Sequence, residues 1–141
     1  MQIEGGRDRR PDPSDEAPPV GDDRGVLRSG AALIADGRAF EAHEVFESAW
    51  RRARAEQGAD ADFWQGLVLV AGALHHADRG NERGRAALLE RAEAKLESAV
   101  ATGGPHAGRA SAVVATLVEH GTSPSGRAAL IEVLRSDRVA E

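Results

Sequence analysis

The sequence of 141 residues contains neither cysteine nor tyrosine. Without cysteine the chain can form no disulfide and no thiolate metal site, and it has no cysteine nucleophile. Clusters of β-branched residues and strict polar–apolar alternation are also scarce, so strands are not expected. These absences exclude a disulfide scaffold and leave helices as the main element type.

Long apolar runs and blocks of positive charge are missing as well. The longest apolar run, from Leu67 to Leu74, is far shorter than the roughly 20 residues that span a bilayer. The net charge is −5, with both signs mixed along the chain, so neither nucleic acid nor a membrane is an expected partner. The first residues lack the apolar core of a secretion signal, and a cytoplasmic location is therefore expected.

The N-terminal segment differs in composition from the rest of the chain. Residues 1–24 are rich in proline, glycine and charge, and they hold too few apolar groups to offset the entropy of ordering. We predict a disordered tail over residues 1–24 and a single helical domain over residues 25–137, a size that suits one core.

Apolar periodicity predicts an all-α fold, a compact bundle of five or six helices. Between Phe63 and Leu74 only Gln65 is polar, so the helix over about 62–79 should lie at the centre of the bundle. Gly66 and Gly72 inside that helix indicate close crossings with its neighbours. The predicted helices cover about residues 26–35, 39–55, 62–79, 82–101, 107–120 and a last segment from 124 onward.

The second predicted helix carries a histidine and acids among aromatic residues. Phe40, His43, Glu47 and Trp50 follow a spacing that places them on one stripe, which we expect to face the interior. A buried ionisable group needs a partner, because an isolated charge in an apolar site costs several kcal/mol. This helix therefore builds either a polar network or a site.

A metal centre is one alternative for this segment. If the second and third helices pack antiparallel, His43 approaches His76 and Glu47 approaches Gly72. His43, Glu47 and His76 could then hold Zn, Mn or Fe, with Glu44 as the general base of a metal-dependent hydrolase.

The favoured alternative is a non-catalytic protein in which a polar cluster fixes the register of the two helices. Its partner would be another protein or a second copy of the chain. A third alternative is a repeat-like helical scaffold that binds a partner in a groove. His106 and His120, near loops, attract no functional hypothesis. The cluster predicted from the sequence comprises His43, Glu44, Glu47, Gln65, His76 and Asn81.

Three blocks of the sequence together resemble domain-of-unknown-function family 309. They are Phe40-Glu41-x-His43-Glu44-x-x-Glu47-x-x-Trp50, then Trp64-Gln65-Gly66-Leu67, then His76-x-x-x-Gly80-Asn81-x-x-Gly84. The resemblance covers about residues 38–97 and implies a helical bundle. It favours His76 over His75 as the partner in the polar cluster, and it implies no activity, substrate or cofactor.

Overall fold

The computed structural model describes residues 22–137, and nearly all of the predicted disordered tail lies outside them. The described part is all-helical, as the sequence predicts, and it contains no strand. The first helix begins at Asp23, three residues before its predicted start. The other helices begin within about two residues of prediction, as do the ends that were predicted. The six helices are α1 (Asp23–Ala35), α2 (Ala39–Ala55), α3 (Ala61–Asp78), α4 (Glu82–Thr102), α5 (Ala107–His120) and α6 (Pro124–Arg135).

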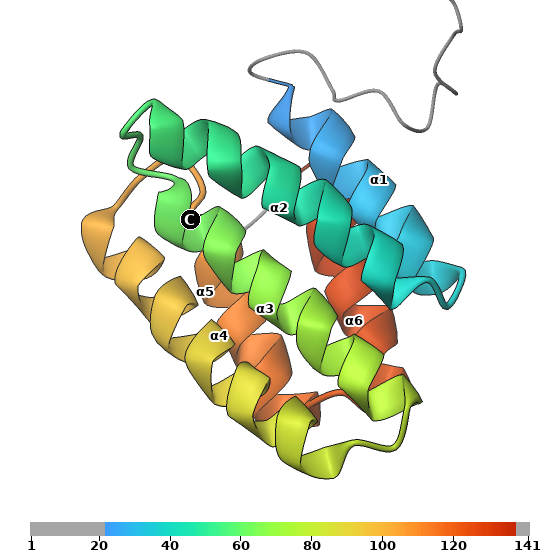
Figure 1. The fold of residues 1–141 in the computed structure, drawn as a ribbon. Coiled ribbons are helices and arrows are strands. Elements are labelled where there is room, and N and C mark those ends of the chain that lie inside the picture. The colour runs from blue at the N-terminus through green and yellow to red at the C-terminus, as the bar shows by residue number, and fades with distance from the viewer. Residues whose placement is uncertain (1–21, 138–141) are drawn as a thin grey trace, which may run out of the picture.

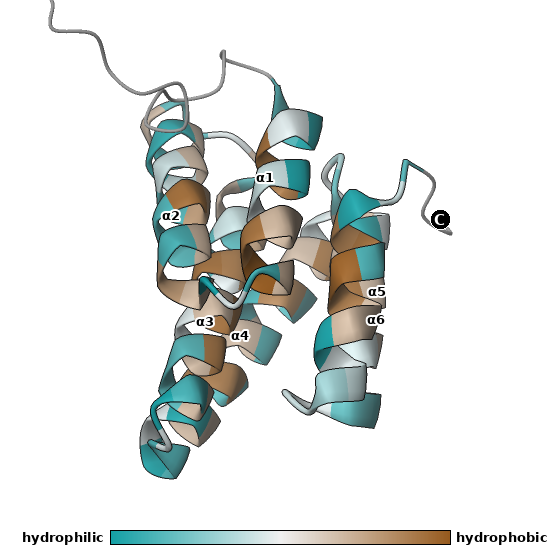
Figure 2. Ribbon diagram, turned by 90° about the vertical axis from the view of Figure 1, so that its right-hand side faces the viewer, coloured by the Kyte–Doolittle hydropathy of each residue, from teal (hydrophilic) through white to brown (hydrophobic). Residues whose placement is uncertain are grey.

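The helices form a closed arrangement in which each packs against the next along the chain, and α1 also packs against α6 (Figure 1). Helices α2, α3 and α4 lie side by side, with α3 in the middle, while α5 and α6 lie behind them. The apolar faces of the helices turn toward one another between these groups (Figure 2). Within residues 22–137, no helix has the length and apolar character needed to cross a membrane.

Helix α3 is the most buried helix, which confirms its predicted central position. Its glycines let neighbouring helices approach closely. A Cβ built on Gly66 would lie 2.6 Å from the side chain of Leu96 on α4, and one on Gly72 would lie 2.9 Å from Leu88. The buried residues of α3 are Phe63, Trp64, Gly66, Leu67 and Leu69 to Leu74.

The buried stripe of α2 is not the predicted one. Phe40 is 49% exposed, whereas Phe46 is 1% exposed. The stripe that faces the core is Ala39, Ala42, Phe46 and Ala49. It has the predicted spacing but begins one residue earlier, which corresponds to a rotation of α2 about its axis by about 100°. The cause is the fit between α1 and α2, because the Phe46 ring occupies the space that a side chain at Gly30 would fill.

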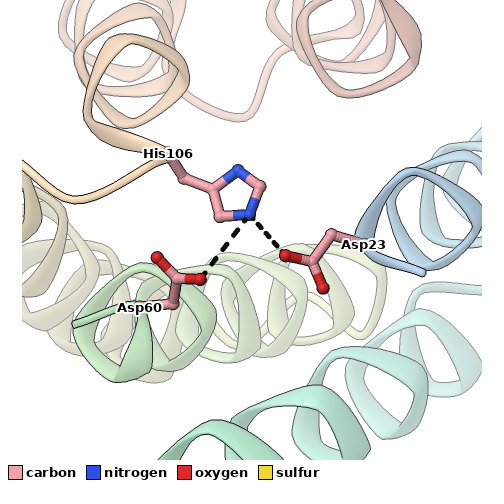
Figure 3. A group of neighbouring side chains, drawn as sticks. All are labelled: Asp23, Asp60 and His106. Atoms are coloured by element: carbon pink, nitrogen blue, oxygen red, sulfur yellow. Dashed lines mark hydrogen bonds and ion pairs between the residues drawn. The ribbon is translucent and has the colours of Figure 1, made fainter. Parts of the chain in front are cut away.

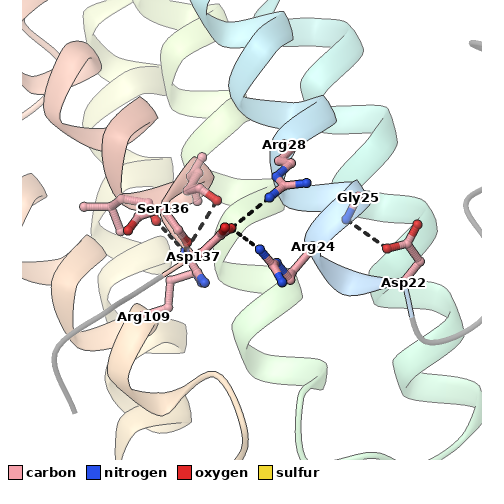
Figure 4. Close-up of polar contacts among 9 residues, drawn as sticks. Asp22, Arg24, Gly25, Arg28, Arg109, Ser136 and Asp137 are labelled. Atoms are coloured by element: carbon pink, nitrogen blue, oxygen red, sulfur yellow. Dashed lines mark hydrogen bonds and ion pairs between the residues drawn. The ribbon is translucent and has the colours of Figure 1, made fainter.

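The C-terminal end of α6 is tied to α1 and α5 by a polar network (Figure 4). The Asp137 carboxylate accepts hydrogen bonds from Arg24 and Arg28, and these bonds hold the pKa of Asp137 below its usual value. The Arg109 guanidinium of α5 donates to the backbone carbonyls of Val133 and Ser136. These contacts close the ring of helices.

Replacement of Asp137 by Asn is expected to lower the free energy of unfolding at neutral pH and to have little effect in acid. A carboxyl whose pKa is lowered by folding contributes stability above its unfolded pKa, and it loses that contribution as pH falls through its folded pKa. The difference between the variant and the wild type should therefore shrink below about pH 4. Urea denaturation at pH 7 and pH 3 measures it.

The matched control is Asp36→Asn, since the Asp36 carboxylate lies 4.0 Å from its exposed partner Arg38. The Asp137 network is solvent-exposed, so its effect should also decrease in high salt. A loss of stability that is equal at the two pH values would mean that Asp137 stabilises the fold by some means other than its charge.

Candidate functional site

The predicted polar cluster between α2 and α3 has a different register from the expected one. His43 Cδ2 lies 3.9 Å from the position of a Cβ on Gly72, and the ring of Phe40 lies 5.4 Å from that of His75. Phe40 thus takes the place near the end of α3 that was expected for His43. His43 faces Gly72, which was expected to face Glu47, so the two helices are offset by about one turn.

The structure does not bring His43, Glu47 and His76 together as ligands. Among the described residues, these three do not form a group whose ligand atoms lie within 4.8 Å of one another. Glu47 forms an ion pair of 3.5 Å with Arg51 on its own helix, and Glu44 is exposed. Gln65 is half-buried on α3.

His76 and Asn81 contribute to the turn between α3 and α4. Asn81 Oδ1 accepts a hydrogen bond from the Gly84 amide, which caps α4, so its amide nitrogen Nδ2 faces His76. This nitrogen donates to His76 Nδ1 over 3.0 Å. A Cβ on Gly84 would lie 2.8 Å from His76 Nδ1, and Gly80 has a φ of +72° in the same turn. The third sequence block is therefore a structural motif of a helical hairpin.

The first sequence block presents rings on the outer surface of α2. Phe40 stacks on His43 with ring centroids 5.8 Å apart, and it also contacts His75 of α3. His43 Nδ1 is buried, and no residue among 22–137 forms a hydrogen bond with it. We use the term α2 face for the surface formed by Phe40, His43, Glu44, Glu47 and His75.

A second polar group lies at the end of the bundle where α1, α3 and α5 begin. It consists of Asp23, Asp60 and His106, which we term the Asp–His cluster (Figure 3). His106 Nε2 lies 2.7 Å from the Asp23 carboxylate and 3.9 Å from that of Asp60. All three side chains are partly buried, and their ligand atoms lie within 4.8 Å of one another.

The imidazole of the Asp–His cluster is held by aromatic residues. The His106 ring stacks on Phe63 at a centroid distance of 4.5 Å and meets the edge of Trp64 at 5.5 Å. Burial raises the pKa of the Asp60 carboxyl, the charge of His106 lowers it, and the neighbouring Asp23 raises it again. The carboxylates of Asp23 and Asp60 therefore both lie beside the His106 imidazole, in a partly buried position.

The sequence analysis missed this cluster because its members lie far apart and His106 seemed an isolated loop residue. A signal was nevertheless present. Asp60 and His106 are the residues before α3 and α5, and Asp23 is the first residue of α1. In an antiparallel bundle with short loops, helices one, three and five begin at the same end. Polar residues at these three positions are therefore expected to meet.

Comparison with known proteins gives a family and nothing more specific. Neither the curated proteins nor the solved structures include a match to this chain. The family model described as Domain of unknown function (DUF309) matches residues 27–88, a range that runs from α1 into α4 and contains all three sequence blocks. Asp23 and His106 lie outside that range. Residues 27–88 thus match the family that the three blocks predicted.

Proposed function

We propose that this chain is a helical protein-interaction module whose α2 face binds a basic, amphipathic segment of a partner protein. The observation that carries the proposal is the exposure of Phe40, which is 49% accessible although it is a large apolar residue. Its stacking on His43 and its contact with His75 hold the ring in place at the surface. A rigid aromatic ring of this kind is a typical anchor of a protein interface.

The charge beside Phe40 supports a basic partner. Glu44 is one helical turn from Phe40, on the same side of α2. Its carboxylate is exposed and has no ion pair with another residue of the range 22–137, whereas Glu41 is paired with Arg38 and Glu47 with Arg51. An unpaired carboxylate beside an apolar ring complements a segment that carries Lys or Arg next to a large apolar residue.

Binding of a synthetic amphipathic peptide of Leu and Lys, compared with its Leu and Glu counterpart, tests the proposal. Isothermal titration calorimetry should detect binding of the basic peptide, and the binding should weaken as salt is added. Phe40→Ala is expected to weaken it at least about tenfold, since truncation of an interface anchor commonly costs more than 1 kcal/mol. Glu44→Gln removes one exposed charge, so it should weaken binding by less and reduce the dependence of binding on salt.

The matched control is Val118→Ala, because Val118 is another exposed apolar residue and lies on α5. This variant should bind the basic peptide as tightly as the wild type does. The proposal is wrong if neither peptide binds, if the two bind equally well, or if Phe40→Ala binds the basic peptide with unchanged affinity.

A further inference from the structure

The Asp–His cluster supports an inference that is independent of the proposed interaction on the α2 face. We propose that Asp23, Asp60 and His106 bind one divalent transition-metal ion, such as Zn²⁺ or Mn²⁺. The cluster combines one imidazole nitrogen with two carboxylates from three different helix ends.

The distances within the cluster suit a shared ion. Imidazole nitrogen and carboxylate oxygen bind zinc at about 2.0–2.2 Å, which places neighbouring ligand atoms roughly 3.4 Å apart in a tetrahedral site. His106 Nε2 lies 2.7 Å from Asp23 Oδ2 and 3.9 Å from Asp60 Oδ2. These two distances would have to change by about 0.7 Å and 0.5 Å to reach this spacing, with the ion between His106 and the two carboxylates.

The aromatic neighbours of His106 prepare the imidazole for this role. The stack on Phe63 and the edge contact with Trp64 fix the plane of the ring, and Nε2 then points toward both carboxylates (Figure 3). A ligand that is already oriented loses little freedom on binding. A doubly charged cation would also neutralise the two carboxylates, which repel each other in a partly buried place.

The chemistry of the ligands selects the class of ion. One nitrogen and two oxygens, with no thiolate, suit Zn²⁺, Mn²⁺ or Fe²⁺ rather than Mg²⁺, which prefers oxygen ligands alone. A pocket of about 340 Å³ borders His106 and is lined by the loop from Gly103 to His106, the start of α5 and Asp137. A site with three protein ligands leaves coordination positions open for water, and the partial burial of all three side chains leaves them partly accessible.

Titration of the full chain with Zn²⁺, and separately with Mn²⁺, tests the site. Calorimetry should give one ion bound per chain, and the melting temperature should rise with metal concentration. Asp60→Asn and His106→Gln should each weaken binding by at least about tenfold. Asp60→Asn changes the site with the least disturbance, because the Asp60 side chain makes no capping hydrogen bond to α3.

The matched control is Asp62→Asn, which removes a carboxylate of similar exposure from the first turn of α3. This variant should bind the ion as the wild type does. If His106→Gln fails to give a folded protein by circular dichroism, the comparison of Asp60→Asn with Asp62→Asn decides the matter.

Three results would overturn the proposal. The first is the absence of binding by either ion, and the second is binding that Asp60→Asn leaves unchanged. The third is binding that is lost in His43→Gln or His76→Gln and retained in Asp60→Asn, since this pattern would place the ion between α2 and α3.

Discussion

Phe46→Ala is expected to lower the free energy of unfolding by about 3–5 kcal/mol, the usual cost of removing a buried aromatic side chain. Phe46 is 1% exposed and packs against Gly30 of α1 and, at a ring distance of 6.5 Å, against Trp64 of α3. Its ring therefore joins three helices. The other core residues of α2 are alanines, which are too small to fill the space that the Phe46 ring would leave.

Phe40→Ala on the same helix is the matched control, and it should cost less than about 1 kcal/mol because half of the ring is already in water. Urea denaturation of the two variants measures the difference. Equal losses, or a larger loss for Phe40→Ala, would mean that α2 presents to the core the stripe predicted from the sequence rather than the one centred on Phe46.

Gly30→Ala is expected to lower the free energy of unfolding by about 1–3 kcal/mol, although alanine favours a helix over glycine by about 1 kcal/mol. A Cβ at this position would lie 2.2 Å from Cζ and 2.4 Å from Cε1 of Phe46. The phenyl ring is rigid and enclosed, so α1 and α2 would have to move apart to accept one methyl group.

The neighbouring exposed substitution Ser29→Ala is the control, and it should leave stability unchanged or raise it slightly. Thermal or urea unfolding gives both values. In addition, Phe46→Leu should recover part of the loss when it is combined with Gly30→Ala, because the smaller side chain makes room for the methyl group. Strict additivity of the two substitutions would contradict the contact between residues 30 and 46.

The sequence predicted the helices well because local signals determine them. The apolar residues of α3 occur on all its sides, and glycine or a capping residue lies at most of the helix ends, so neither the six elements nor the central position of α3 required long-range information. Gly66 was also recognisable as a close crossing, because an interior glycine destabilises a helix unless it relieves a contact.

The orientation of α2 was not predictable from periodicity alone. Its large aromatic residues Phe40 and Trp50 and its alanines Ala39 and Ala49 fit two stripes that differ by one residue. Side-chain size favours the stripe of Phe40 and Trp50, although that stripe also holds His43 and Glu47. The observed stripe is entirely apolar, and in it one ring, Phe46, fills the gap at a glycine on another helix. That choice depends on a partner more than ten residues away.

The polar residues show the same division between local and long-range information. The contact between His76 and Asn81 joins residues five apart, and the motif block already placed both in the predicted cluster. The Asp–His cluster joins residues up to 83 apart, and it requires the directions of three helices. Helix direction follows from short loops, but the distances within the cluster follow only from the packed structure.

The contact between α1 and α6 has a consequence for the rate at which the chain folds. The other main helix pairs in the described part are neighbours along the sequence, so most of the bundle has the low contact order that is typical of fast folding. Docking of α6 on α1 closes a loop of about 100 residues. Among the main helix pairs of the described part, this contact alone carries the large entropic cost of closing such a loop. We therefore expect the ion pairs of Asp137 to form late, and to affect the rate of unfolding more than the rate of folding.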